Sequence, residues 1–291
     1  MSYIEVINYE RDWSNKSVFQ SIMIDLLSPV FVYEQKDSVD DILETLYDLS
    51  QGFPYKTDYN ISLMRQLIFI EGIDFLYRAI NFLQAIQKSM KDGFFTASQS
   101  MSYQASFFAT RSILAISGVY CSCVNNKDVL IESFYLEDDL INQIYIDKIK
   151  RNHQNIWSLF TKLIKTTTVD ENIIDKKLFK IIQDVNYNHC SNQRHSIHYY
   201  NKYEFKDLFE RVIITPPFID NLTLCKLKAN NCEYFLMASL LVLLASNLFY
   251  SISQYTNGLE DLYNKLNNML SIANNPILKE INFYACLKKN N

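Results

Sequence analysis

The sequence predicts an all-α protein, and two observations carry this prediction. Glycine and proline number only five each among 291 residues, a depletion that favours long helices over a turn-rich β architecture. Apolar residues recur at helical spacing over residues 60–90, 96–119 and 230–256. We therefore expect a multi-helix bundle with two long central helices in a hairpin and a buried long C-terminal helix.

The two central helices are predicted to lie antiparallel, because only Lys91-Asp92-Gly93 separates them. The second of these helices has small residues every three or four positions, which let another helix approach closely. They are Ser98, Ser102, Ala105, Ser106, Ala109, Ser112 and Ala115. Arg111 is the one charged residue of this helix, so we expect it to meet a carboxylate or to reach solvent, with a functional role as the alternative.

The flanking regions suggest two parts, an N-terminal region over 1–58 packed on the bundle and a helical domain over 59–291. Residues 37–49 read as a helix capped by Ser38, and Gly52-Phe53-Pro54 ends that pattern. Further helices are expected over 128–134, 138–163 and 170–184. No internal repeat is visible.

The helix over 230–256 raises the question of a membrane. Residues 234–259 carry no charge, which is long enough to cross a bilayer. Polar residues are frequent in this stretch, however, so we expect a core helix and no membrane insertion. They are Ser239, Ser246, Asn247, Ser251, Ser253 and Gln254.

The cysteines and the N-terminus predict a cytoplasmic protein. The six cysteines show no CxxC spacing, and the first residues lack the apolar segment of a secretion signal. Cys121-Ser122-Cys123 is read as buried thiols, with a metal or redox role as the alternative.

Charge is unevenly spread along the chain. The net charge is −4, yet residues 148–211 carry 12 Lys/Arg against 7 Asp/Glu and hold all four histidines. A basic region on an acidic protein fits an anionic ligand, and a solvated surface is the other reading. The Walker A, GxGxxG, HExxH and GxSxG motifs are absent from the sequence.

Three of the four histidines fall within residues 189–198, beside Arg194. If this segment is helical, Arg194 and His198 stand four apart and share one face. An imidazole can move a proton and a guanidinium can bind phosphate oxygens with two N–H groups, which together suit phosphodiester chemistry.

Two other readings of this segment stay open. A metal could bind His189, Cys190, His195 and His198, although no second ligand pair nearby supports the usual structural zinc site. In a purely structural reading, Arg194 pairs with Asp184, Glu204 or Asp207, and His198 is a half-buried histidine.

The order of two long helices, an Arg-polar-x-Ile-His-Tyr element and a final apolar helix resembles the HEPN superfamily. The family signature is an arginine followed a few residues later by a histidine, often with a polar residue after the arginine. Here His195 follows Arg194, and the gap to His198 is one residue shorter than the family's range. The resemblance implies an all-α fold and a metal-independent endoribonuclease of a prokaryotic defence or toxin–antitoxin system, with RNA as substrate and no cofactor.

In that activity His198 would be the general base or acid, and Arg194 would hold the phosphate. Asn192 and His195 would orient the substrate or the catalytic histidine, and Tyr199 would stack on a base. The alternative function is a non-catalytic helical interaction or regulatory subunit that binds a protein or nucleic-acid partner through the same surface.

The small residues of the second central helix and the many aromatic residues lead us to predict a homodimer or a complex with a partner protein. Light scattering on the purified protein at tens of micromolar, about the range in which moderate interfaces are occupied, should give the mass of a dimer. A monomeric mass with no co-purifying partner would contradict the prediction.

Overall fold

The computed structural model describes residues 12–13, 38–54, 56–59, 61–92, 94–133, 144–148, 150–169, 174, 176–185, 187, 233–253, 264 and 268. Helices make up 69% of this part, so the described protein is mainly helical. The helices are α3 (Val39–Leu46), α4 (Ile61–Lys91), α5 (Phe95–Ile116), α6 (His153–Thr166), α7 (Lys176–Asp184) and α11 (Glu233–Ser253).

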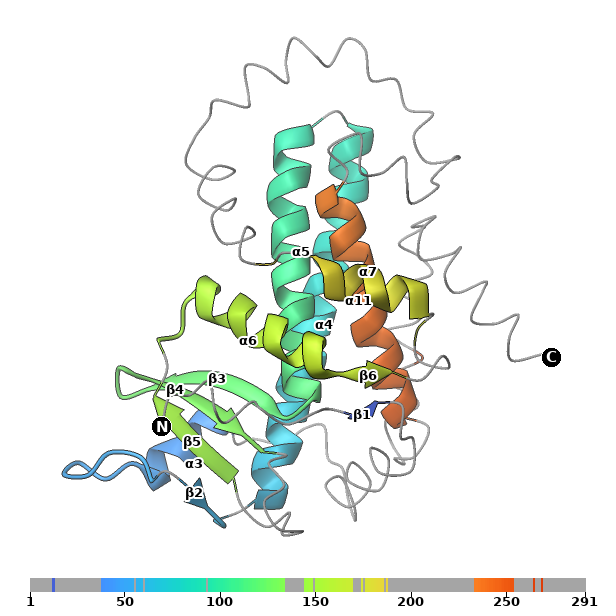
Figure 1. Cartoon of the computed structure of the whole chain (residues 1–291). Coiled ribbons are helices and arrows are strands. Elements are labelled where there is room, and N and C mark those ends of the chain that lie inside the picture. The colour runs from blue at the N-terminus through green and yellow to red at the C-terminus, as the bar shows by residue number, and fades with distance from the viewer. Residues whose placement is uncertain are drawn as a thin grey trace.

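Helices α4 and α5 form the predicted hairpin, and they run side by side along the long axis of the drawing (Figure 1). The two helices approach each other closely at Gly72 of α4. A Cβ atom built there would lie 3.2 Å from Ala115 Cβ and 3.2 Å from Ile116 Cγ1, both on α5. The two helices are therefore packed tightly at this level, and any side chain at position 72 would press on α5.

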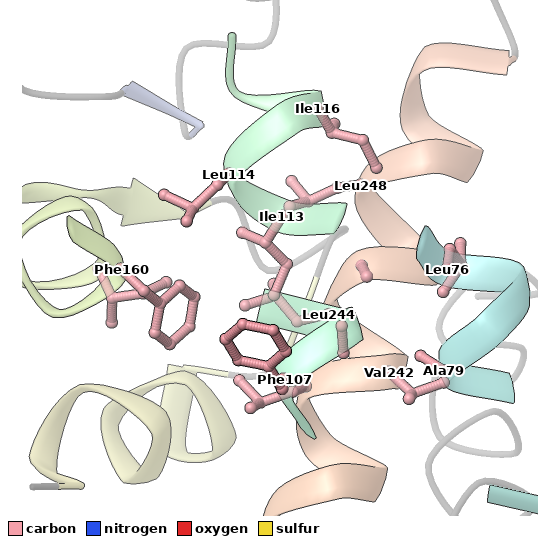
Figure 2. Packing of buried hydrophobic residues seen from close by; sticks show 14 of the residues in the cluster. Leu76, Ala79, Phe107, Ile113, Leu114, Ile116, Phe160, Val242, Leu244 and Leu248 are labelled. Carbon is pink, nitrogen blue, oxygen red and sulfur yellow. The ribbon is translucent and has the colours of Figure 1, made fainter. Parts of the chain in front are cut away.

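Helix α11 packs against both helices of the hairpin, as expected for a buried C-terminal helix. Figure 2 shows Val242, Leu244 and Leu248 of α11 beside residues of α4 and α5 in one core, to which Phe160 of α6 also belongs. None of the helices in the described part is long and apolar enough to cross a membrane. The small residues of α5 are buried in this packing, so they serve contacts inside the chain.

The strictly all-α prediction is wrong, because the structure contains a four-stranded antiparallel sheet with one strand before α4 and three after α5. Its strands are β2 (Lys56–Thr57), β5 (Ile144–Lys148), β4 (Lys127–Glu132) and β3 (Val119–Val124), in that spatial order. The sheet lies beside the lower end of the hairpin in Figure 1. With α3 and the first turns of α4 it encloses a second hydrophobic core.

The helix predicted over 128–134 is strand β4, and the sequence carried a sign of it. Asn125 and Asn126 both adopt positive φ, at 51° and 58°. Two such residues make the tight turn that suits the twist of a β-hairpin, and asparagine tolerates this conformation. The turn pairs Val124 with Lys127 and sets the register of β3 against β4.

Two other expected helices are shorter than predicted. The segment predicted helical over 138–163 contains strand β5, and α6 begins at His153 after the side chain of Asn152 caps it. The segment over 170–184 holds α7. A short parallel pair joins β1 (Asp12–Trp13) to β6 (Thr168–Val169).

The predicted cap of α3 is confirmed. The Ser38 hydroxyl accepts a hydrogen bond from the Asp41 backbone N–H, and the Asp41 carboxylate accepts one from the Ser38 N–H. This reciprocal arrangement satisfies two helix-end donors that would otherwise lack partners.

A buried arginine joins the end of the sheet to α4. The Arg65 Nε–H donates to the Ser133 carbonyl oxygen at 2.7 Å. Arg65 is 6% exposed and Glu132 is 1% exposed. Burial lowers the pKa of Arg65 to about 10, and the charge of Glu132 acts in the opposite direction. The guanidinium is thus held where strand β4 ends against the first turn of the long helix.

Replacing Gly72 with leucine should destabilise the fold, because the new side chain would meet the α5 backbone at Ile116 N, 3.3 Å from the Cβ position. Overpacking of this kind costs about 1–3 kcal/mol. Urea unfolding followed by circular dichroism should show a lower midpoint for Gly72→Leu, whereas Asn81→Leu, at an exposed position of α4, should unfold like the wild type. Equal midpoints for Gly72→Leu and the wild type would contradict the close approach.

Candidate functional site

The residues that the sequence predicts as a site lie outside the described part of the chain. This holds for Arg194, His198, Asn192, His195 and Tyr199, and for the alternative metal ligands His189 and Cys190. Of the carboxylates considered as partners of Arg194, Asp184 is described. It pairs with Lys180 of its own helix, with 3.0 Å between Nζ and Oδ1.

Within the described residues, charged and polar side chains gather where α3, α4 and α5 meet the sheet. We call this group the Arg111 cluster. Hydrogen bonds, an ion pair, a ring contact and mutual electrostatic effects connect its members. They are Asp40, Glu71, Phe75, Arg78, Arg111, Tyr120, Ser122, Asp128 and Arg151.

Arg111 stands at the centre of this cluster. Its Cζ atom lies 3.8 Å from the centroid of the Phe75 ring, so the guanidinium stacks on the ring face. Burial lowers the pKa of Arg111, which measures the cost of removing this cation from water. Arg111 keeps some exposure, as one of the two expectations has it. Among the described residues no carboxylate lies within ion-pair distance of it, and Glu71 acts on it only electrostatically.

The carboxylates of the cluster differ in their surroundings. The Ser122 hydroxyl donates to Asp40 Oδ1, and Asp128 lies 4.0 Å from Arg151 Nε. The pKa of Glu71 is raised, first by burial and then by the charge of Asp74, and the attraction of Arg111 does not outweigh these effects. Glu71 thus takes up a proton more readily than an ordinary glutamate does.

Cys121 shows what burial does to a thiol in this region. It is 5% exposed, and burial raises its pKa to about 12. A thiol that stays protonated is a poor nucleophile and a poor metal ligand. This supports the buried-thiol reading for Cys121, whereas Cys123 is half-buried. The described residues contain no group of three or more His, Cys, Asp or Glu that could hold a metal ion.

A second polar contact lies between α5 and α6. Tyr103 Oη lies 2.7 Å from His153 Nδ1, and the Trp157 indole N–H donates to the same oxygen at 3.4 Å. The His153 ring stacks on Phe107 with 4.0 Å between centroids. The Tyr103 hydroxyl thus contacts both Trp157 and His153, and this chain of contacts holds the start of α6 against α5.

Sequence reasoning selected Arg111 but missed the residues around it. Its neighbours come from segments between residues 40 and 151, and no local spacing relates Glu71 to Tyr120 or Asp128. One sign was available, because Phe75 and Arg78 lie three apart on the same helix and therefore share a side of it.

Replacing Glu71 with glutamine should stabilise the protein at neutral pH. The native pKa of Glu71 is raised above the ordinary value of 4.5. The folded state therefore binds more protons than the unfolded state between 4.5 and the raised pKa, and stability falls as the pH rises through that window. Urea unfolding should give Glu71→Gln a higher midpoint than the wild type at neutral pH, and the gain should vanish below pH 4.5.

The matched control is Glu44→Gln, which removes an exposed carboxylate of α3 and should leave the midpoint unchanged. A Glu71→Gln protein that is less stable than the wild type at neutral pH would show that the charged carboxylate is needed, for example as a partner of Arg111.

Comparison of the chain with protein-family models, with curated proteins and with solved structures finds no match.

Proposed function

We propose that the chain is a HEPN-like, metal-independent endoribonuclease of a prokaryotic defence or toxin system. The observation that carries this proposal is the pair Arg194 and His198. Three of only four histidines in the chain lie within ten residues of one another, and a guanidinium stands four positions before the last of them.

The proposed reaction needs one proton-transfer group and one cation. A free imidazole titrates near neutrality, so the side chain of His198 can take a proton from a ribose 2′-hydroxyl or give one to the leaving oxygen. Arg194 donates two parallel N–H groups to the phosphate and stabilises the charge that builds up on the phosphoryl oxygens. Asn192 and His195 orient the substrate, and Tyr199 stacks on a base.

The described helices are compatible with the proposal at the level of the scaffold. The resemblance implies two long helices before the motif and an apolar helix after it. Helices α4 and α5 precede the motif in the chain, and the buried helix α11 follows it. The small sheet after α5 is an addition to the arrangement that the resemblance implies.

The direct test is cleavage of a labelled single-stranded RNA by the purified protein in EDTA. The wild type should cut the RNA, because the motif supplies a base and a cation and does not depend on a divalent metal. His198→Ala should abolish cleavage, and Arg194→Lys should be severely impaired since lysine keeps the charge but loses the paired donors. Circular dichroism should show all variants equally helical.

His189→Ala is the matched control, because it removes a neighbouring histidine to which the mechanism gives no role. It should cut like the wild type, whereas the alternative metal site would lose its activity with His189 and in EDTA. Expression of the wild type should slow growth, and expression of His198→Ala should not. If the wild type cuts no RNA, or His198→Ala cuts as well as the wild type, a non-catalytic interaction subunit is the better reading.

A further inference from the structure

One narrow side of α5 keeps contact with solvent. Between residues 101 and 116, every residue is buried except Met101, Gln104, Phe108 and Arg111, which are half-buried. Their spacing of three, four and three places them on one side of the helix. Arg111 thus lies on the part of this helix that a ligand can approach.

The guanidinium of Arg111 has five N–H donors to satisfy. In the part of the chain that the structure describes, no acceptor takes a hydrogen bond from it, and no carboxylate oxygen lies within 4.0 Å. Its contact there is the Phe75 ring, 3.8 Å from Cζ. Stacking uses the face of a guanidinium and leaves the N–H groups at its edge available to an anion.

A second guanidinium lies near the Phe75 ring and also near the Phe108 ring. Arg78 is exposed on α4, and its Cζ atom lies 5.8 Å from the Phe108 centroid and 5.9 Å from the Phe75 centroid. It too lacks a hydrogen bond or ion pair with any residue described by the structure. Two cations beside one aromatic ring repel each other, and an anion bound between them would relieve that cost.

The rings themselves form a row along the hairpin. Phe82 stacks on Phe108 with centroids 5.7 Å apart and planes 9° apart, and Phe108 stacks on Phe75 at 6.2 Å and 26°. The row continues to Tyr120 of β3 at 6.4 Å. Phe82 and Phe108 are half-buried, so part of each ring remains open for contact with a flat, apolar group.

The nearby carboxylates do not neutralise the two arginines. Asp128 is engaged by Arg151 and Asp40 by Ser122. Glu71 acts electrostatically on both Arg78 and Arg111, but no ion pair within 4.0 Å joins it to either of them. Asp74 is half-buried and lies four positions before Arg78 on α4, so it adds a further negative charge beside this face. The cations of this face are therefore left for a ligand of opposite charge.

We propose that the face formed by Arg78, Phe82, Phe108 and Arg111 binds a nucleotide unit, with its phosphate on the two guanidinium groups and its base against the exposed ring edges. A phosphate oxygen matches the fork of an arginine, and a nucleobase matches an aromatic row. The face takes single-stranded RNA, and this choice of source over a free mononucleotide rests on the proposed ribonuclease function.

The test is fluorescence anisotropy with a labelled single-stranded oligoribonucleotide, in EDTA and with His198→Ala as the parent so that the probe stays intact. Removing one charge-assisted contact is worth about 1.5–3 kcal/mol, so Arg111→Gln and Arg78→Gln should each weaken binding roughly tenfold or more. Phe108→Leu keeps the position apolar and should weaken binding through loss of stacking.

Lys88→Gln is the matched control, because it removes one exposed positive charge of α4 at a position outside the face. It should bind the probe within about twofold of the parent, as expected for a distant charge screened by salt. The double variant Arg78→Gln/Arg111→Gln should also show a smaller dependence of binding on salt, by about 0.7 in the logarithmic slope per lost phosphate contact.

A competition arm with uridine monophosphate separates the two sources of the nucleotide. We expect the oligoribonucleotide to bind at least about tenfold more tightly than the monophosphate, because a strand adds stacking contacts along the ring row. Equal affinities would overturn RNA as the ligand. Arg78→Gln, at an exposed position, keeps the test valid if Arg111→Gln fails to fold.

The proposed RNA-binding face is refuted if both arginine variants bind the probe like the parent, or if Lys88→Gln weakens binding as much as they do. It is also refuted if the parent binds neither RNA nor the monophosphate. This binding test is independent of the cleavage test of the ribonuclease proposal. A wild type that binds RNA through these arginines but does not cut it leaves the face standing and removes the catalytic role of Arg194 and His198.

Discussion

The close contact between α4 and α5 is the constraint on which the described structure depends. At Gly72 the two helices approach so closely that a Cβ atom would press on Ala115 and Ile116. A hairpin this tight buries one side of each helix, and α11 then packs on both. The second core, between the sheet and the first turns of α4, also includes Ala115 near the end of α5. Both hydrophobic cores therefore contain residues of the α4–α5 hairpin.

The same geometry explains why a sheet can follow a long helix without a linker. Gly118 takes a φ of +82° and its N–H donates to the Ala115 carbonyl oxygen, which ends α5 and turns the chain into β3. Ser133, just after β4, donates back to the Gly118 carbonyl oxygen through its backbone N–H. With Arg65 bound to the Ser133 carbonyl, both ends of the β3–β4 hairpin are held at the foot of α4. The sheet is thus anchored to the α4–α5 helical hairpin.

The side of α5 that keeps partial exposure follows from this packing. Helices α4, α6 and α11 all contact α5, and what remains is the stripe that carries Phe108 and Arg111. Placing a cation there costs solvation energy, which the Phe75 ring offsets only in part. A protein that needed only a packed bundle could place an apolar residue at this position. The presence of Arg111 and Arg78 at one aromatic ring is the physical basis for assigning the face to an anionic, aromatic ligand.

The sequence by itself determined the elements whose signals are local. The periodic apolar residues of α4, the cap of α3 at Ser38 and the buried character of α11 could be predicted because each depends on residues a few positions apart. The sheet could not, since β3 and β4 read as apolar runs that suit a helix equally well, and the pairing with β5 is decided by a common core with α3. Tertiary structure alone brought Glu71, Tyr120 and Arg151 to Arg111, because residues far apart in sequence meet only after the hairpin and sheet have packed. The pair of Arg194 and His198 stays a prediction from the sequence. A spacing of four residues places two side chains on one face of a helix, and this spacing is visible without the fold.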